Sequence, residues 1–295
     1  MSRTFLVDDD PRSRDARPSP GDQENESTPD ARTAAAVAGE AGDARAPRAP
    51  RSFASLVSCS PAMHELFEVA AQLADLDCTV LLLGEPGTGK ELFARALHSA
   101  GKRRHGRFVT VNCADPPAAL CDAALLADDI PGASDGARAL DALKGGTLFL
   151  DHVESTSLHD QSRLLRVLED APRRPGEAAR SPLEIRIVAA ANEELSELVE
   201  CGAMRSDFFH RLNVVPLHIP ALRERPEDVA LLAGRFLERS ELARENGVHG
   251  VTDEALRDLA AHAWPGNVRE LESVLERALL TASGREIGCR DLVRS

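Results

Sequence analysis

The chain has 295 residues, of which 43% are hydrophobic and 28% are charged, so it is long enough for one large or two modest packed domains, and two is the working number. Its formal net charge of −13 opposes nonspecific attraction to nucleic acid, and its six cysteines form no C-x-x-C pair, which argues against a zinc site or a disulfide framework. No apolar stretch approaches the roughly 18 residues of a membrane span, and the N-terminus lacks the apolar core of a signal peptide, so we expect a cytoplasmic protein without membrane contact.

The first segment, residues 1–50, is rich in Ala, Pro, Asp, Arg, Ser and Gly and has little large apolar content after Val7. Such a composition buries too little apolar surface to offset the entropy lost on ordering, and it predicts a disordered tail. Residues 4–14, TFLVDDDPRSR, resemble the first strand and acidic pocket of a response-regulator receiver domain. Because no phospho-acceptor strand follows, we favour coincidence or a truncated vestige over a working receiver.

The pattern changes at Phe53, where strand and helix signals begin to alternate. Residues 60–74 and 90–100 carry apolar side chains at helical spacing, and the short apolar run 78–84 lies between them. Three more buried-strand candidates follow, which are FVTVN at 108–112, GGTLFLD at 145–151 and IRIVAAAN at 185–192. This alternation predicts an α/β domain with a parallel sheet of at least four strands, which we place at residues 51–222.

After the segment LRERPEDV the sequence pattern is only helical. Helical spacing covers residues 228–239, 252–262 and 267–281, and the breaks between them contain glycine or a Trp-Pro-Gly triplet. We therefore predict a small all-α domain at residues 223–295.

The segment GEPGTGK lies between a predicted strand and a predicted helix and fits the phosphate-binding pattern G-x-x-x-x-G-K. Its glycines let backbone N–H groups turn toward a phosphate, the following helix adds its positive end, and the lysine can hold the β and γ oxygens. The residues predicted to bind nucleotide here are Gly84, Glu85, Pro86, Gly87, Thr88, Gly89, Lys90 and Glu91. Glu91 stands where the generic pattern has a Ser or Thr ligand of magnesium, so the metal needs other ligands. The alternative is a glycine loop that only caps the helix.

Several segments in order resemble the AAA+ domain of bacterial enhancer-binding proteins, the sigma-54-dependent transcriptional activators, over about residues 53–283. These segments are GEPGTGKELFARALH, FVTVNCA, GGTLFLD, LLRVLED, FFHRLNV, PALRER and WPGNVREL. The resemblance implies an α/β AAA+ P-loop NTPase fold with a parallel sheet flanked by helices, followed by a small all-α lid domain. It also implies a ring of like or related AAA+ subunits, usually a hexamer, that uses ATP and Mg²⁺ at subunit interfaces to remodel RNA polymerase holding sigma-54.

The resemblance assigns roles to residues at the ends of the strands. Lys90 and the loop glycines would bind the phosphates, and Asp151 would hold Mg²⁺ through water. Asn112 would be the switch that senses the γ-phosphate. Asn192 would be the polar sensor residue, although Ala191 stands where the family usually has Thr.

Three arginines complete the set of residues that the resemblance implies. Arg205 and Arg211 match the pair that reaches into the nucleotide of the neighbouring subunit, and Arg269 matches the sensor of the helical domain. For each arginine the alternative is an ordinary solvated helix residue.

The first departure from the family pattern is His152, which stands where a glutamate orients and deprotonates the attacking water. Loss of a positioned base lowers the rate by about 10²- to 10⁴-fold, whereas nucleotide binding depends on Lys90, the loop and Asp151. Glu154 lies two residues further on, and we expect that it does not reach back to the site. The sequence thus predicts a degenerate family member that binds ATP and hydrolyses it weakly or not at all.

The second departure lies in the loop that touches sigma-54 in the family, where the usual sequence is GAFTGA. The matching residues here are Gly132, Ala133, Ser134, Asp135, Gly136 and Ala137. Small polar and anionic side chains replace an apolar wedge, so we expect an altered contact with sigma-54, unless this segment is misaligned. The chain also ends at Ser295 without a helix-turn-helix, so we expect no direct DNA binding.

Three functions stay open at this stage. The first is a nucleotide-binding AAA+ subunit that hydrolyses ATP poorly and regulates transcription within a ring or through an active relative. The second is a working ATPase that tolerates His152 and activates sigma-54 RNA polymerase from solution. The third is a non-catalytic protein-interaction module whose nucleotide site is only structural.

Overall fold

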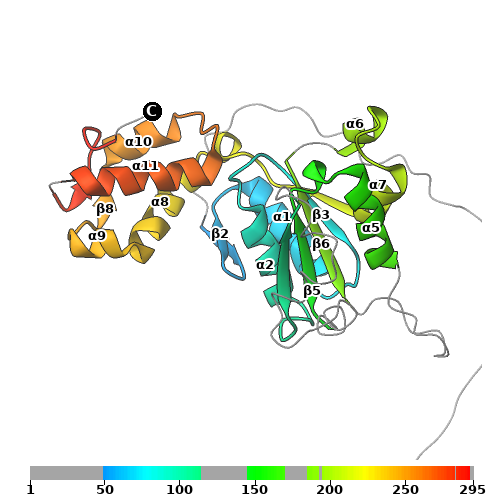
Figure 1. The fold of residues 1–295 in the computed structure, drawn as a ribbon. Coiled ribbons are helices and arrows are strands. Elements are labelled where there is room, and N and C mark those ends of the chain that lie inside the picture. Colours follow the sequence, from blue (N-terminus) through cyan, green and yellow to red (C-terminus); the bar gives the residue numbers. More distant parts are fainter. Residues whose placement is uncertain (1–48, 114–144, 170–184, 193–194, 283, 293–295) are drawn as a thin grey trace, which may run out of the picture. The chain divides into compact units, whose positions relative to one another are not determined.

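A parallel sheet forms the centre of the α/β part of the chain (Figure 1). The computed structural model describes residues 49–113, 145–169, 185–192, 195–282 and 284–292, which belong to one unit, Arg45–Ser295. The strands are β3 (Val80–Leu83), β4 (Phe108–Asn112), β5 (Thr147–Asp151), β6 (Arg186–Ala191) and β7 (Val215–His218). They lie in the order β4-β5-β6-β3-β7, and all neighbours are parallel, which confirms the α/β fold.

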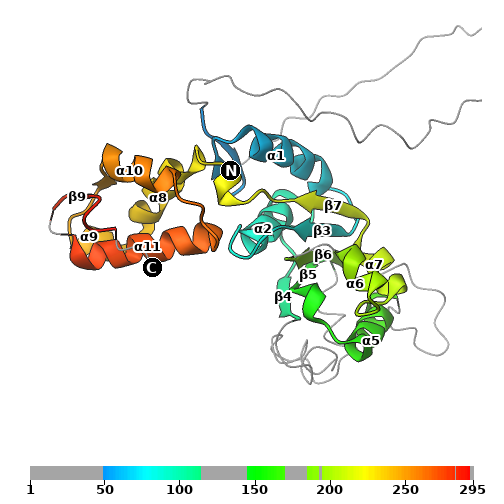
Figure 2. The ribbon, with the colours of Figure 1, turned by 90° about the horizontal axis from the view of Figure 1, so that it is seen from above.

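Side chains of β3 alternate between two hydrophobic cores, one on each face of the sheet. The flanking helices are α1 (Pro61–Ala74), α2 (Lys90–Ala100), α5 (Leu158–Glu169), α6 (Leu195–Glu200) and α7 (Ser206–Leu212). Val80 and Leu82 belong to the core with α1 and α2, and Leu81 and Leu83 to the core with α5, α6 and α7. Figure 2 shows these two sets of helices on opposite sides of the strands. Covering both faces explains why the central strands are apolar throughout.

Three short elements of the α/β part were not predicted. The strands β1 (Arg51–Phe53) and β2 (Leu56–Ser58) form an antiparallel hairpin before α1. The fifth sheet strand, β7, pairs with β3 at the edge of the sheet and contains Pro216. A proline is tolerated at a sheet edge because its missing N–H leaves no gap inside the ladder.

The helical part contains α8 (Asp228–Arg239), α9 (Glu241–Glu245), α10 (Asp253–Ala260) and α11 (Asn267–Thr281). Its core surrounds Trp264, which is 2% exposed and donates from Nε1 to the carbonyl of Leu259 at 2.8 Å. The expectation of helices alone was wrong in one detail, because β8 (Gly250–Val251) and β9 (Glu286–Ile287) form a short parallel pair. This pair ties the segment after α9 to the segment after α11.

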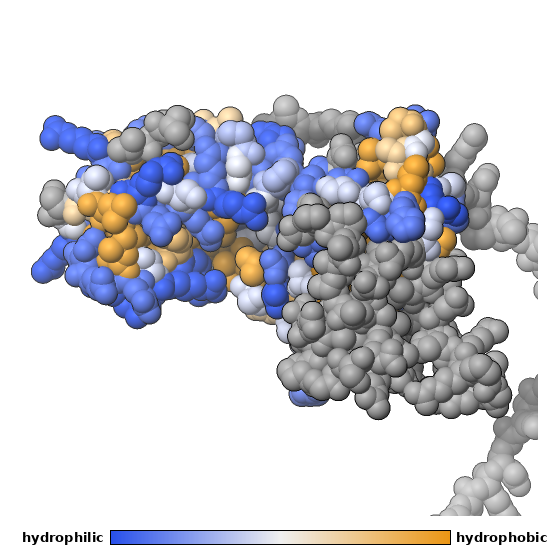
Figure 3. Space-filling model, in the orientation of Figure 1, coloured by the Kyte–Doolittle hydropathy of each residue, from blue (hydrophilic) through white to orange (hydrophobic). Residues whose placement is uncertain are grey.

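The surface shown in Figure 3 is mainly hydrophilic where its residues are described, with separate hydrophobic areas over the helical part and near α6 and α7. None of the helices in the described part of the chain combines the length and apolar character needed to cross a bilayer. The receiver-like residues 4–14 and the loop 132–137 lie outside the described residues.

Candidate functional site

The predicted phosphate loop connects β3 to α2 and has the backbone of a tight turn around its glycines. Gly84, Gly87 and Gly89 all have positive φ angles, of 153°, 79° and 101°. A Cβ atom at Gly84 would lie only 2.7 Å from the carbonyl oxygen of Ile219, so a side chain does not fit there. The loop therefore needs glycine both for its conformation and for the close approach of a neighbouring segment.

Lys90 is the first residue of α2, and its ammonium group lies at the mouth of this loop. Nζ donates to the carbonyls of Gly84 at 2.7 Å and Glu85 at 3.0 Å, and to Oδ1 of Asn192 at 2.7 Å. Burial lowers the pKa of Lys90, and the nearby carboxylates, Asp151 first, oppose that shift. The structure thus brings together the lysine and the asparagine that the sequence assigned to the same site.

Asp151 ends β5 and faces the same cleft. The cleft, of about 180 Å³, is lined by Lys90, Asp151, His152 and Asn192 together with loop residues and residues of α11. Asn112 ends β4 in register with Asp151, so the predicted switch residue lies on the neighbouring strand. Carboxyl ends of parallel strands are a common position for ligand sites because the strands end together there.

His152 follows Asp151 with a φ of 56°, so the chain turns sharply as it leaves the strand. The turn η1 (Val153–Ser155) follows, and it brings Glu154 back beneath the cleft. Oε1 of Glu154 accepts from Nδ2 of Asn192 at 2.7 Å and lies 3.4 Å from Nδ1 of His152. Glu154 does not itself line the cleft, as expected, but the left-handed conformation of His152 brings it into contact with Asn192 and His152, which do.

A magnesium ion fits this site only together with a nucleotide. No group of three His, Cys, Asp or Glu side chains among the described residues is arranged to hold a metal ion. Mg²⁺ is usually held by one or two carboxylates plus phosphate oxygens and water, so the single carboxylate of Asp151 beside the phosphate loop suits it. Glu91 also lines the cleft, and its Oε1 accepts from Nη2 of Arg95 at 2.8 Å.

The helical part contributes directly to the cleft. Val268, Arg269 and Glu272 of α11 line it, so Arg269, to which the resemblance assigns a sensor role, lies at the cleft. The sequence analysis missed Asn267, which is fully buried and donates from Nδ2 to Oε2 of Glu85 at 3.1 Å and to the carbonyl of Pro86 at 3.0 Å. Asn267 lies inside the segment WPGNVREL, and this position could have marked it as a site residue.

Two further arginines that the sequence analysis did not assign also bind the phosphate loop. Arg223 forms a bidentate ion pair with Glu85, with distances of 2.6 and 2.8 Å. Arg225 is buried and donates from Nη2 to the carbonyl of Thr88 at 3.0 Å. Both lie in the segment that leads from β7 into α8, so the loop is held from the helical side as well.

A larger cavity, of about 530 Å³, adjoins the cleft. The two share Gly89, Leu92, Val268, Arg269 and Glu272. The larger cavity is lined by Leu56 and Val57 of the hairpin on one side and by Leu232 of α8 on another. The lining also includes Arg235, Arg239 and Glu276, and it takes Thr88, Gly89 and Arg269 from the predicted motifs. A mainly apolar cavity beside the phosphate loop suits a flat aromatic ring.

Arg205 and Arg211 are not among the residues that line the cleft or the adjoining cavity. Arg205 binds Asp207 through two contacts of 2.7 and 3.0 Å and donates from Nη1 to Ser162 Oγ at 3.1 Å. Both arginines are exposed around α7, so a single chain does not bring them to its own cleft.

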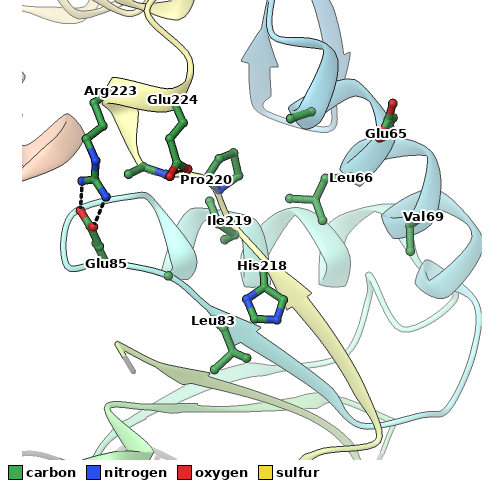
Figure 4. A pocket seen from close by; sticks show the side chains of 13 residues that line it. Glu65, Leu66, Val69, Leu83, Glu85, His218, Ile219, Pro220, Arg223 and Glu224 are labelled. Atoms are coloured by element: carbon green, nitrogen blue, oxygen red, sulfur yellow. Dashed lines mark hydrogen bonds and ion pairs between the residues drawn. The ribbon is translucent and has the colours of Figure 1, made fainter. Parts of the chain in front are cut away.

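A separate cavity of about 510 Å³ lies between α1 and the ends of β3 and β7. Figure 4 shows Leu66 and Val69 of α1 facing His218 of β7, with the Arg223–Glu85 pair at the edge. None of Lys90, Asp151 and His152 lines this cavity. The residues predicted to bind phosphate and metal therefore line the smaller cleft and not this cavity.

Two family models match the chain. The Sigma-54 interaction domain matches residues 56–218, and the AAA+ ATPase lid domain matches residues 223–295.

Curated relatives share about two fifths of the aligned residues. The DNA-binding transcriptional activator HyfR of Escherichia coli is 42% identical over 80% of this chain and 36% of its own length. The DNA-binding transcriptional regulator NtrC of Azospirillum brasilense is 43% identical over 79% of this chain and 49% of its own length. The transcriptional regulatory protein ZraR of Salmonella typhimurium is 40% identical over 80% of this chain and 55% of its own length. The chain thus spans about half or less of the length of these relatives.

Solved structures agree with this match. NtrX from Brucella abortus in complex with ATP has a TM-score of 0.67 and 33% identity over 82% of this chain and 56% of that chain. A complex of the same protein with ADP has the same TM-score and 31% identity, with the same shares of the two chains covered. Hsp104 bound to ATPγS and casein has a TM-score of 0.53 at 18% identity, covering 74% of this chain and 43% of that chain, which is a likeness of fold alone.

Proposed function

Because the chain belongs to the sigma-54 interaction domain family of AAA+ proteins, we propose that it binds ATP with Mg²⁺ and takes part in transcription regulation. The observation that carries this proposal is the cleft that Lys90 and Asp151 both line beside the phosphate loop. Relatives named as transcription regulators and the NtrX complexes with ATP and ADP support it. Lys90 and the loop amides would hold the phosphates, and Asp151 would hold the metal through water.

The adjoining cavity gives the adenine ring a place in this proposal. Leu56, Leu232 and Val268 supply apolar contacts, and the cavity opens onto the cleft through the residues that both share. Adenine would lie between the hairpin and the helical part, with Arg269 near the phosphates. We also propose that the chain consists of an α/β nucleotide-binding domain at residues 51–222, a helical lid domain at residues 223–295 and a tail at residues 1–50.

Hydrolysis is proposed to be weak because His152 stands in the position of the catalytic glutamate. A positioned base typically contributes about 10²- to 10⁴-fold, so the His152→Glu variant is expected to turn over ATP at least about tenfold faster than the natural chain. Charge neutralisation by the metal and by arginines accounts for any residual rate. Phosphate release under saturating ATP measures the difference.

Binding and turnover are separated by two controls. Isothermal titration calorimetry should detect ATP and ADP binding to the natural chain and to His152→Glu, and Lys90→Ala should lose most of it. Equal turnover by the natural chain and His152→Glu would instead favour a working ATPase that tolerates the histidine. No heat with either nucleotide would contradict the proposal and leave only an interaction module.

Arg205 and Arg211 are proposed to act on the nucleotide of a neighbouring subunit in a ring, which would be a hexamer. Their exposure around α7 and their distance from this chain's own cleft-lining set support that reading. Sedimentation velocity with ATP should show assembly by the natural chain and less assembly by Arg211→Ala. Contact with sigma-54 through GASDGA, altered from the family loop, stays a proposal.

A further inference from the structure

We infer that His152 presents an Nε2–H group to the cleft and donates it to the terminal phosphate of ATP. The side chain in the position of the base would then distinguish ATP from ADP, without accepting a proton from water. This inference rests on the proposed nucleotide site and assigns a role to one residue within it. It follows from the direction of each hydrogen bond around the ring.

The direction is set first at Lys90. An ammonium group only donates hydrogen bonds, so the atom of Asn192 that lies 2.7 Å from Nζ must be its amide oxygen. The amide nitrogen of Asn192 then faces the other way. A second contact agrees, because that nitrogen lies 2.7 Å from Oε1 of Glu154, and a carboxylate oxygen accepts.

The same amide nitrogen lies 2.8 Å from Nδ1 of His152. The only other polar neighbour recorded for Nδ1 in the described part of the chain is Oε1 of Glu154, at 3.4 Å. Because N–H···O bonds usually measure about 2.7–3.2 Å, the shorter contact decides, and Nδ1 accepts from Asn192. A neutral imidazole carries one hydrogen, so that hydrogen lies on Nε2.

Nε2 is the ring nitrogen that can donate a hydrogen bond to a ligand in the cleft. Its distance to Oδ2 of Asp151 is 3.9 Å, which is longer than a hydrogen bond. His152 lines the cleft beside Lys90, and its side chain is 33% exposed. The N–H group is thus available to a phosphate oxygen held by the lysine.

A general base at Nε2 would require the opposite arrangement. The ring hydrogen would lie on Nδ1, and it would face the N–H of Asn192 at 2.8 Å, so that two donors would oppose each other. Asn192 cannot turn over to relieve this, because its oxygen would then face Glu154 and its nitrogen would face Lys90. The network therefore holds the histidine as a donor.

Glu154 is the positioning residue of this network. Its Oε1 accepts from both the side chain and, at 3.3 Å, the backbone N–H of Asn192, although Glu154 does not line the cleft. Its other oxygen, Oε2, is buried without a hydrogen-bond partner among the described residues. A buried carboxylate with one unpaired oxygen is costly, and the bonds of the other oxygen to Asn192 give this carboxylate a role in fixing Asn192 and His152.

The first test determines which ring nitrogen of His152 carries the hydrogen. Two-dimensional ¹H–¹⁵N spectra of the nucleotide-free protein near pH 8, compared with His152→Gln to assign the signals, should show His152 with its hydrogen on Nε2. A hydrogen on Nδ1 would overturn the inference. Asn192→Ala removes the donor to Nδ1 and should shift the ring toward the other tautomer.

The second test compares affinities for a non-hydrolysable ATP analogue and for ADP by calorimetry. His152→Ala should lower the affinity for the analogue by about tenfold or more, because a hydrogen bond to a charged group is lost, and it should leave the affinity for ADP unchanged. His152→Gln keeps an N–H donor and should retain most of the preference for the ATP analogue over ADP. Glu154→Ala should resemble His152→Ala, whereas Glu154→Gln keeps an oxygen for Asn192 and should resemble the natural chain.

The outcomes separate this inference from the proposed function. An unchanged ratio of the two affinities in His152→Ala overturns the role of His152 and leaves the nucleotide site standing. Failure of the natural chain to bind either nucleotide overturns the site and, with it, the inference.

Discussion

Glu85 illustrates how a single residue in the phosphate loop is held in place. Its carboxylate accepts two hydrogen bonds from Arg223 and one from Asn267. Together these lower the pKa of Glu85 from 4.5 to about 2, the bonds from Arg223 having the larger effect. The ionised form is therefore the one that the folded loop favours.

This shift predicts a pH dependence of stability. A carboxyl group with a lowered pKa in the folded state stabilises the fold above about pH 4.5, and the contribution fades as the pH falls from 4.5 toward 2. Glu85→Gln lacks this contribution, so the free energy of unfolding of the natural chain should approach that of the variant below pH 4.5. The effect is small because the pair is exposed to solvent.

Urea unfolding of both proteins at several pH values between about 6 and 3 measures the convergence. A gap between the two free energies of unfolding that stays constant across this window would contradict the assignment of the shift to Glu85.

At the scale of residues, the motifs predicted which side chains lie together in the cleft, but they did not predict the contacts of Glu154. Lys90, Asp151 and Asn192 come together in the cleft as their positions at strand and loop ends indicated. The return of Glu154 could not be predicted, because it depends on the positive φ of His152, and non-glycine residues seldom adopt that conformation. Glu154 is the third residue after the end of β5, and its sequence position alone does not indicate a return toward the strand end.

At the scale of elements, the start of α8 ties the helical part to the hairpin before α1. Asp228, the first residue of α8, is fully buried and accepts from Ser58 Oγ at 2.7 Å. It also accepts from the backbone N–H groups of Cys59 at 2.6 Å and Ser60 at 3.2 Å. One carboxylate thus satisfies donors of a segment about 170 residues away in the sequence.

Replacing Asp228 by alanine is expected to lower the free energy of unfolding by about 3–5 kcal/mol. The change removes the acceptor of the buried Ser58 hydroxyl and of the Cys59 N–H, and it removes the carboxylate that lies 3.8 Å from the buried guanidinium of Arg225. Chemical denaturation measures the loss. Asp228→Asn keeps one acceptor oxygen and should cost less.

The matched control is Asp253→Ala, at the exposed first position of α10. Only the favourable interaction with the helix dipole is lost there, which is worth up to about 1 kcal/mol. Equal losses in Asp228→Ala and Asp253→Ala would contradict the role assigned to the buried carboxylate.

Elements with long apolar runs were predictable because burial on both faces dictates their composition. The strands β3, β5 and β6 and the helices α2, α8 and α11 follow the expected positions closely. The missed elements are short and lie where burial is one-sided, as in β7, whose residues are alternately buried and exposed at the sheet edge. Two-residue strands such as β8 and β9 carry too few side chains for a periodic signal.

For the molecule as a whole, Asn267 is a buried residue through which α11 contacts the phosphate loop. Besides its bonds to Glu85 and Pro86, its Oδ1 accepts from the backbone N–H of Leu222 at 2.7 Å. The next residue, Val268, donates its N–H to the carbonyl of Gly87 at 3.0 Å. Asn267 has a φ of 52°, a conformation that asparagine tolerates better than most residues.

Asn267→Ala is expected to lower both stability and ATP affinity. Three hydrogen bonds of a buried side chain are lost, and alanine is less suited to the left-handed conformation, so we expect about 2–4 kcal/mol less stability. ATP affinity should fall by about tenfold or more, because the loop loses the two side-chain bonds from α11 to Glu85 and Pro86. Thermal unfolding and calorimetry measure the two effects.

The control for Asn267 is Asn246→Ala. Asn246 donates from Nδ2 to the carbonyl of Leu279 at 2.7 Å, which is a contact within the helical part. This variant should lose stability while keeping the affinity for ATP. Loss of affinity in both variants would show that general weakening of the helical part, and not the contact with the loop, is responsible.

The hydrogen bond from Val268 to Gly87 makes one peptide group of the phosphate loop an attachment point for α11. Occupancy of the loop and the orientation of that helix are then linked variables. A ligand or subunit that favours one orientation of α11 would then change the dissociation constant for nucleotide. By thermodynamic reciprocity, nucleotide would change the dissociation constant of that ligand or subunit by the same factor.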